Sequence, residues 1–502
     1  MSRSYMTVWC LALVLLAATG ANCLYKLELM QVVHRSGVAP PPMATPDREK
    51  LCSPNGKSNC AAIANRGVQQ LKDMGAHIAE LYAQDGETED SKTWLSPPYD
   101  PTAVYSQSLG SPVATRAATA LLSGIYGAEE GGVAPVIISA APSTDTLLNV
   151  NALPSFALEN ESGAEEFARE MEKVVSEQFP DASVIGDMGK EVGMGDACSA
   201  TNAHVWCCHR LQQLVTMYSS VPNGGDGAPT VMKHAAQLQA VAAARNSALY
   251  GYVASDSLSA ARGSLGQPLA QELLLGMRRK MLQGGDANHN HNRVMHYAHD
   301  TPIHTVLGHE ATNAVPLAET FLIDLLRDSA TGVYFVRLRY LAVETKPEAS
   351  PAVASFPFRC LNAAGEPSAT VSGDATTCPF DDFVRFVDSS KGASGVGAAC
   401  HLEADTEERL QCRTAGPPTS PQCAQYRALC PAHACPDGHI YDTANGICYL
   451  RYVREDVMAN GAAVSLAAVL IFVGVAFSVI VLHLCPLRCV RSSPLGEEDL
   501  KA

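Results

Sequence analysis

The sequence predicts a layered α/β core that is interrupted by a helical insertion. Short apolar runs alternate with amphipathic helical segments up to about residue 160, the pattern then turns helical, and strand-like runs return after about residue 285. The chain has 502 residues, which exceeds the roughly 250–300 residues that one hydrophobic core supports. We therefore expect more than one compact unit.

The first half of the core is predicted from three strands and two helices. Val68, Leu71, Met74 and Ile78 recur at helical spacing and indicate an amphipathic helix. The strands are runs of apolar residues that end at glycine, serine or proline. We expect strands at 25–34, 103–108 and 135–139, and helices at 61–83 and 114–126.

The rest of the core follows a helical cap. Its clearest helices are expected at 165–178 and 269–282, and a glycine-rich loop at 223–227 breaks the region. Strand character returns at 293–298 and 332–340. We assign 22–160 and 285–390 to the α/β core and 160–285 to the cap.

Both ends of the chain have membrane-targeting patterns. Arg3 precedes an apolar run and small residues, so 1–21 is predicted to be a signal peptide. The apolar segment 461–484 is long enough to cross a bilayer. We expect a single-pass type I protein of the endosomal or lysosomal membrane or the cell surface, with a lumenal or extracellular ectodomain and a cytoplasmic tail at 485–502.

The ectodomain is rich in cysteine, and in an oxidising compartment cysteines pair as disulfides. Segment 391–456, with six cysteines and little apolar periodicity, is predicted to be a disulfide-stapled membrane-proximal module. Zinc is the rival hypothesis, because His401, His433 and His439 lie among these cysteines. Asn160 begins a glycosylation sequon, Asn-Glu-Ser.

The charge balance excludes one class of partner. The formal net charge is −15, whereas proteins that bind a phosphate backbone carry clustered lysine and arginine. We expect no nucleic acid partner.

Three stretches, in this order, resemble one protein family. The first is VVHRSGVAPP at 32–41, the second runs from Gly67 through Gln70 and Gly75 to Tyr82, and the third is YAHDT at 297–301. Over about 25–385 the chain resembles the histidine acid phosphatases, the branch of the histidine phosphatase superfamily that includes lysosomal and membrane-bound acid phosphatases. The resemblance implies the histidine phosphatase fold, an α/β core with a helical cap. It also implies a closing helix-strand pair at 316–340 and a late disulfide between Cys360 and Cys378.

That family hydrolyses phosphate monoesters by transferring the phosphoryl group to a histidine. A neutral imidazole attacks in line, arginines hold the phosphate oxygens, and an acid protonates the leaving oxygen. By resemblance, Arg35 and His299 are expected to bind phosphate, and Asp300 is expected to donate the proton.

Three positions depart from the family pattern. Gly37 aligns Ser36 with the nucleophilic histidine and Ala39 with the second arginine, and Val113 stands where a third arginine is expected. If each missing arginine acts like a lost oxyanion donor, it costs about 10²–10³ in rate. Catalytic impairment is therefore the leading expectation.

Substitutes for the missing groups offer an alternative. His34 shares the strand face of Ser36 but lies about 6.6 Å away along the strand. Ser36 could itself be a nucleophile with His34 or His299 as its base. Arg116, nearly one helical turn after Val113, could supply the third guanidinium.

The histidine-rich loop around His289 and His291 resembles loop metal sites, but its spacing fixes no third ligand. We expect no metal and no cofactor. The leading hypothesis is a catalytically impaired type I membrane glycoprotein of this family, which acts as a binding or surface protein toward an unknown protein or ligand. The alternatives are an active acid phosphatase with a phosphate monoester substrate, and a receptor that uses the cap and the cysteine-rich module.

Overall fold

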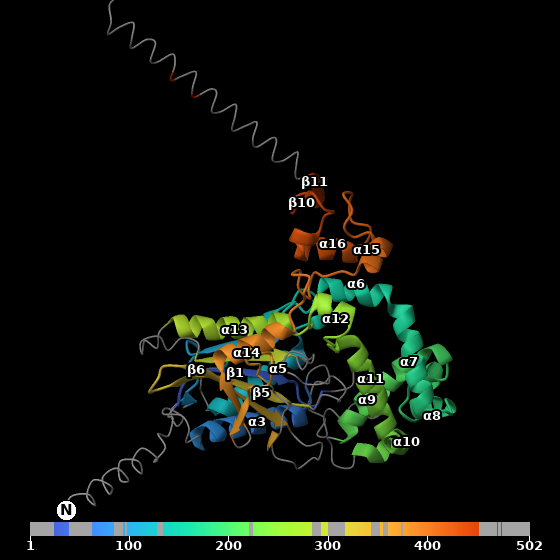
Figure 1. Ribbon diagram of the computed structural model, residues 1–502. Coiled ribbons are helices and arrows are strands. Elements are labelled where there is room, and N and C mark those ends of the chain that lie inside the picture. The colour runs from blue at the N-terminus through green and yellow to red at the C-terminus, as the bar shows by residue number, and fades with distance from the viewer. Residues whose placement is uncertain are drawn as a thin grey trace, which may run out of the picture. The chain divides into compact units, whose positions relative to one another are not determined.

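The computed structural model describes the chain as two compact units, residues 1–410 and 411–502. Each unit is described by itself below (Figure 1). The described residues are 25–39, 63–84, 94–95, 98–127, 134–219, 224–283, 293–299, 317–342, 352–354, 360–372, 375–450, 469 and 473.

A nine-stranded sheet forms the centre of the first unit. Its order is β3-β2-β4-β1-β5-β6-β9-β8, and β7 pairs with β6. The β3, β2, β4 and β1 strands are parallel, and β5 onwards pair antiparallel. The strands are β1 (Tyr25–Arg35), β2 (Val104–Leu109), β3 (Ile138–Ala140), β4 (Val294–His299), β5 (Thr320–Asp328), β6 (Tyr334–Ala342), β7 (Ala352–Ala354), β8 (Thr370–Ser372) and β9 (Ala375–Pro379).

Helices cover both faces of this sheet, so β1 is buried on both sides. Val32 of β1 packs in the cluster that contains residues of α3 (Asn65–Gln84) and α5 (Pro112–Tyr126). Val33, which points to the other face, packs in the cluster of α13 (Gln267–Leu282) and α14 (Phe380–Ser389). Figure 1 shows α13 and α14 on one side of the strands and α3 on the other.

The α3 and α5 helices approach each other at two glycines. A Cβ at Gly75 would lie 2.2 Å from the carbonyl oxygen of Leu121, and a Cβ at Gly124 would lie 2.2 Å from that of Lys72. Only residues without a side chain allow this distance between the two backbones. The α5 helix begins with Pro112 after Ser111, whose Oγ accepts a hydrogen bond from the amide of Ala114 at 3.1 Å.

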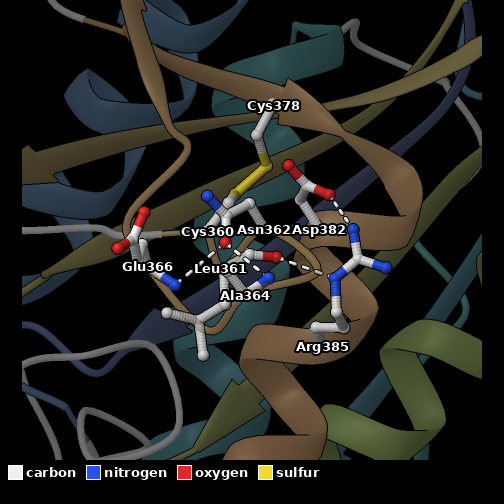
Figure 2. A network of polar contacts seen from close by, with 8 residues as sticks. All are labelled: Cys360, Leu361, Asn362, Ala364, Glu366, Cys378, Asp382 and Arg385. Carbon is white, nitrogen blue, oxygen red and sulfur yellow. Dashed lines mark hydrogen bonds and ion pairs between the residues drawn. A yellow bond between two sulfur atoms is a disulfide. The ribbon is translucent and has the colours of Figure 1, made fainter.

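The α14 helix is tied to the loop before β8 by a small polar network (Figure 2). A disulfide joins Cys360 to Cys378, as the resemblance implies. Arg385 donates from Nε to the carbonyl oxygen of Leu361 at 3.0 Å and pairs with Asp382. These contacts hold the loop against the helix.

The helical insertion has a core of its own. Its apolar cluster includes Met171, Ile185, Leu211 and Leu238, and a disulfide joins Cys198 to Cys207. The helices are α6 (Pro154–Ser162), α7 (Ala164–Gln178), α8 (Ser183–Glu191), α9 (His204–Ser219), α10 (Pro229–Lys233), α11 (Ala235–Tyr250) and α12 (Ser257–Arg262). The α13 helix, which lies within the predicted cap at 160–285, packs on the sheet.

The second unit is small and stapled by disulfides. It contains α16 (Pro421–Leu429), a hairpin of β10 (His439–Asp442) and β11 (Ile447–Leu450), and the disulfides Cys412–Cys423 and Cys435–Cys448. Arg427 is fully buried and donates to the carbonyl oxygens of Cys412, Gly416 and Thr414 at 2.6–2.9 Å. This unit begins at Gln411, whereas the predicted module begins at 391. The α15 helix (Ala404–Leu410) belongs to the first unit.

The strands and helices expected from the sequence are present, with one correction. Segment 316–340 was expected to be a helix followed by a strand, but its described part forms the antiparallel pair of β5 and β6. The β5 strand is buried along nearly its whole length, and a continuous apolar run does not distinguish a buried strand from a buried helix.

Within the described part of the chain, no helix is long and apolar enough to cross a membrane. The predicted signal peptide at 1–21, the tail at 485–502 and, apart from Val469 and Val473, the predicted span at 461–484 lie outside the described residues.

Candidate functional site

The structure brings two of the sequence motifs together at the ends of neighbouring strands. β1 and β4 are parallel, and Arg35 is the register partner of His299. Arg35 is half-buried and His299 is buried. The carboxyl ends of parallel strands are where α/β proteins place their ligands. The two residues that the resemblance assigns to phosphate binding therefore share one edge of the sheet, whereas Asp300 lies outside the described residues.

A third ionisable residue, Glu319, lies beside Arg35 and was not predicted from the sequence. Its carbonyl oxygen accepts a hydrogen bond from the amide of Arg35 at 2.8 Å, and its side chain is only 2% exposed. Burial raises the pKa of the Glu319 carboxyl to about 8, and the positive charge of Arg35 lowers it in part. The one available signal was an acidic residue directly before the apolar run of β5.

The loop that follows β1 packs against the N-terminal part of α3. A Cβ at Gly37 would lie 2.6 Å from the carbonyl oxygen of Gly67, so the two backbones touch. The amide of Val38 donates to Oε1 of Gln70 at 3.1 Å. Ser36 is buried in this loop, and its carbonyl oxygen accepts from the amide of Ala318 at 3.0 Å. The motif residues Gly67 and Gln70 thus position the loop that carries Ser36.

Neither position where the resemblance implies a further arginine has a charged group. Ala39 is half-buried. Val113, in the first turn of α5, packs against the apolar cluster on the α3 side of the sheet. Arg116 is exposed on α5.

His34 is buried on the opposite face of β1 from Arg35. Its ring stacks on His296 of β4 with the centroids 4.9 Å apart, and its Nδ1 makes a hydrogen bond with the carbonyl oxygen of Arg35 at 3.0 Å. Burial lowers the pKa of His34 to about 4 and holds the pKa of His296 well below its usual value. His296 also contacts Oγ of Ser106 at 2.7 Å. His34 therefore lies in a packed neutral cluster, away from the carboxyl-end group of Arg35, His299 and Glu319.

The cysteines of the predicted module form disulfides rather than a zinc site. Besides the two disulfides of the second unit, Cys400 and Cys430 are also disulfide-bonded. Among the described residues, no three histidine, cysteine or acidic side chains form a group that could hold a metal ion. His289 and His291 lie outside these residues, and Asn160 is exposed on α6.

The fold and these strand ends define a mixed α/β protein with a charged cluster at the carboxyl ends of its central parallel strands. Its structural neighbours are phytases and an inositol polyphosphate phosphatase.

The chain is similar to the phytase of Klebsiella sp. ASR1, with 16% identity over 76% of this chain and 100% of that one and a TM-score of 0.46. It is similar to the Citrobacter braakii phytase, with 14% identity, 72% and 97% coverage and a TM-score of 0.48. It is also similar to the multiple inositol polyphosphate phosphatase of Bifidobacterium longum, with 12% identity, 64% and 88% coverage and a TM-score of 0.41. At these identities the similarity concerns the fold alone. The sequence matches no family model and no curated protein.

Proposed function

We propose that this protein is a catalytically impaired member of the histidine acid phosphatase family that acts as a membrane-anchored binding protein. The proposal is carried by the alignment of Ser36 with the nucleophile, in a loop whose backbone contacts Gly67 and Gln70 of α3. An alcohol is a weak nucleophile unless a base activates it, and phosphoryl transfer also needs a strongly cationic pocket.

The charges around Ser36 support the same conclusion. The positive charge of Arg35 acts on the buried carboxyl of Glu319. Ala39 and Val113 contribute no charge, so the transferring phosphoryl group would lack the guanidinium groups that stabilise its transition state. His34, the nearest imidazole in sequence, is buried in the stack with His296. One observation favours the alternative of an active acid phosphatase: Arg35 and His299 remain side by side.

The test compares the natural full-length protein in detergent with a variant in which Ser36→His, Ala39→Arg and Val113→Arg restore the motif. Hydrolysis of an aryl phosphate at acid pH is the measurement. We expect the natural protein to show only background hydrolysis and the variant to exceed it about 10⁴-fold or more, because each arginine contributes about 10²–10³.

Two controls make this result specific. Adding Asp300→Asn to the restored variant should abolish the gained turnover, because the leaving oxygen loses its proton donor. Turnover by the natural protein that disappears on Asp300→Asn alone would instead identify an active acid phosphatase with a phosphate monoester substrate. Failure of the restored variant to hydrolyse phosphate would contradict the alignment of Ser36.

The membrane topology is part of the proposal. A signal peptide at 1–21 and a span at 461–484 would place the ectodomain in the lumen of endosomes or lysosomes or outside the cell, and Asn160 is exposed as a glycosylation acceptor must be. Removal of N-glycans should shift the mobility of the natural protein but not of Asn160→Gln. Digestion of the ectodomain by protease added to sealed microsomes, whose outer face corresponds to the cytosol, would contradict this topology.

A further inference from the structure

The helical insertion, α6 to α12, joins the core through two helix ends that lie beside each other. It begins with α6, directly after Leu153, and it ends with α12, whose last residue is Arg262. Arg262 forms an ion pair with Glu159 of α6 at 2.8 Å, so the two connecting helices are in contact (Figure 1). One place in the fold therefore contains both connections of the insertion.

The two helix ends need hydrogen-bond partners from another segment. The first amides and the last carbonyl groups of a helix have no partner within it. Leu153, at the N-cap of α6, has no side-chain oxygen that could accept from the amide of Ser155. The carbonyl oxygens of Ala260 and Ala261 lie in the last turn of α12.

Residues 390–400, which follow α14 and which we call the strap, supply the partners for α12. The amide of Ala393 donates to the carbonyl oxygen of Ala260 at 2.9 Å, and that of Ser394 donates to Ala261 at 3.2 Å. The strap thus caps the C-terminal end of the insertion.

The same strap caps the N-terminal end of the insertion. Ser155 donates its amide to the carbonyl oxygen of Ala399 at 3.1 Å and its hydroxyl to that of Ala398 at 2.7 Å. Ala398 also packs in an apolar cluster with Leu153 and Leu265, which flank the two connections. One short segment therefore binds both ends of the insertion.

Two glycines bring the strap and α12 into backbone contact. A Cβ at Gly392 would lie 2.4 Å from the carbonyl oxygen of Arg262 and 2.5 Å from that of Ala261. Gly263, with a φ of +87°, approaches the amide nitrogen of Gly392 so closely that a Cβ there would lie 2.5 Å from it. The close contact requires glycine at both positions.

The insertion also contacts the loop of the candidate site. Val38 packs in the apolar cluster of the insertion together with Met188 and Leu211. A rotation of the insertion would therefore change the contacts of the loop that carries Ser36.

We propose that the strap fixes the orientation of the helical insertion relative to the sheet. When the strap is attached it holds both ends of the insertion, and when it is detached the insertion rotates about its connections at Leu153 and Gly263. Local opening of a short segment costs less free energy than unfolding, so the strap can detach while the sheet stays intact. The inference requires no chemistry at Ser36 and is independent of the proposed function.

Gly392→Ala tests the contact with α12, because the added methyl group must displace one of the two backbones. Hydrogen–deuterium exchange of the full-length protein in detergent is the measurement. We expect the amides of Ala393 and Ser394 to exchange about tenfold faster, and the amide of Ser155 at the other end of the strap to follow them. Exchange within α9, in the apolar core of the insertion, should not change.

Ser155→Ala is a milder variant, because it removes one buried hydrogen bond. The amide of Ala393, at the other end of the strap, should exchange about fivefold faster. Ser176→Ala is the matched control, since it removes a hydrogen bond from a serine hydroxyl to a carbonyl oxygen at 2.8 Å on α7, outside the strap. If Ala393 responded to neither serine variant, or equally to both, the strap would not link the two ends and the proposal would be overturned.

Spin labels on cysteines at two exposed positions, Asp73→Cys of α3 and Glu177→Cys of α7, measure the rotation itself. Pulsed electron paramagnetic resonance should give one narrow distribution of distances with the natural strap. Addition of Gly392→Ala should broaden or shift this distribution. An unchanged distribution would overturn the proposal, because the insertion would then keep its orientation without the strap. The phosphatase assay on the same preparations decides the proposed function separately.

Discussion

The residues that support the loop at 36–39, which we call the framework, differ from the residues of the candidate site. The framework residues keep the identities that the resemblance implies, whereas three site residues do not. In the framework, Gly67 touches Gly37, Gln70 accepts from the amide of Val38, and Tyr82 donates to Asp324 of β5. At the candidate site, Ser36 and Ala39 of the loop and Val113 of α5 stand where the resemblance implies an imidazole and two guanidinium groups.

The difference shows that the two sets of residues are constrained in different ways. Framework residues make contacts inside the protein, so their replacement changes the folded state whether or not a ligand exists. Ligand-contacting residues can change without disturbing the backbone that carries them. A fold can therefore persist while the residues that contact a ligand change.

The largest effect is expected at the buried ion pair of the framework. Asp324 pairs with Arg337 at 2.9 Å, both side chains are fully buried, and Tyr82 donates to the same carboxylate. Asp324→Asn leaves the charge of Arg337 without its counter-charge, which should cost about 3–5 kcal/mol in the free energy of unfolding. Chemical denaturation measures this cost.

Asp73→Asn is the matched control for this change. Asp73 is exposed on α3 and accepts a hydrogen bond from Gln69, so its replacement should alter stability by less than about 0.5 kcal/mol. If the two variants were equally stable, the framework would be no more constrained than the surface.

The close contact below the loop should produce the next largest effect. A Cβ at Gly67 would lie 2.3 Å from the carbonyl oxygen of Val38. Gly67→Ala must therefore displace one backbone, at a cost of about 1–3 kcal/mol, which thermal unfolding can detect. Gly416→Ala, where a Cβ meets nothing within 4 Å, should change stability by no more than about 0.5 kcal/mol.

The two faces of β1 should respond to pH with opposite signs. The folded-state pKa of His34 is lowered to about 4 from 6.5, so its contribution to stability is present above 6.5 and is lost as the pH falls through 4. The pKa of Glu319 is raised to about 8 from 4.5, so its burial penalty is largest above 8 and disappears as the pH falls toward 4.5.

Variants separate these opposite contributions. Between about pH 7 and about pH 5, His34 alone should remove about 2 kcal/mol from the free energy of unfolding. Chemical denaturation at both pH values measures the free energy of unfolding of each variant. His34→Leu should not show this loss of stability, and Glu319→Gln should not show the gain of stability that the natural Glu319 gives as the pH falls. Identical pH profiles for the natural protein and both variants would contradict the burial of these two groups.

The smallest effect is expected at Arg116, the alternative source of the third guanidinium group that the sequence offers. It is exposed on α5. Added to the restored variant, Arg116→Ala should change the turnover of an aryl phosphate by less than about twofold and the stability by less than about 0.5 kcal/mol. A large loss of turnover would bring α5 into the site and would weaken the contrast drawn above.

The sequence predicts the framework well because each of its signals is local. The helical spacing of Leu71, Met74 and Ile78 marks α3, and the apolar run before Arg35 marks β1. The meeting of Arg35 with His299 follows from two motifs that both end parallel strands.

The remaining part of the site depends on strand pairing, which leaves no local signal. Glu319 reaches Arg35 because β5 runs antiparallel beside β1, and the apolar run of β5 fits a buried helix as well as a buried strand. The stack of His34 on His296 likewise depends on the register of β1 and β4. Neither contact could be predicted without the order of the strands.

The position of β4 between β1 and β2 has a consequence for biosynthesis. Both flanking strands leave the ribosome long before β4, because the helical insertion is translated in between. Gln31 of β1, for example, contacts Met295 of β4 at a sequence separation of 264. The pairings of β1 and β2 with β4 can form only after β4 has been translated. Late closure of a parallel sheet is slow and exposes the chain to aggregation, so chaperone binding should be heaviest before residue 299 is synthesised.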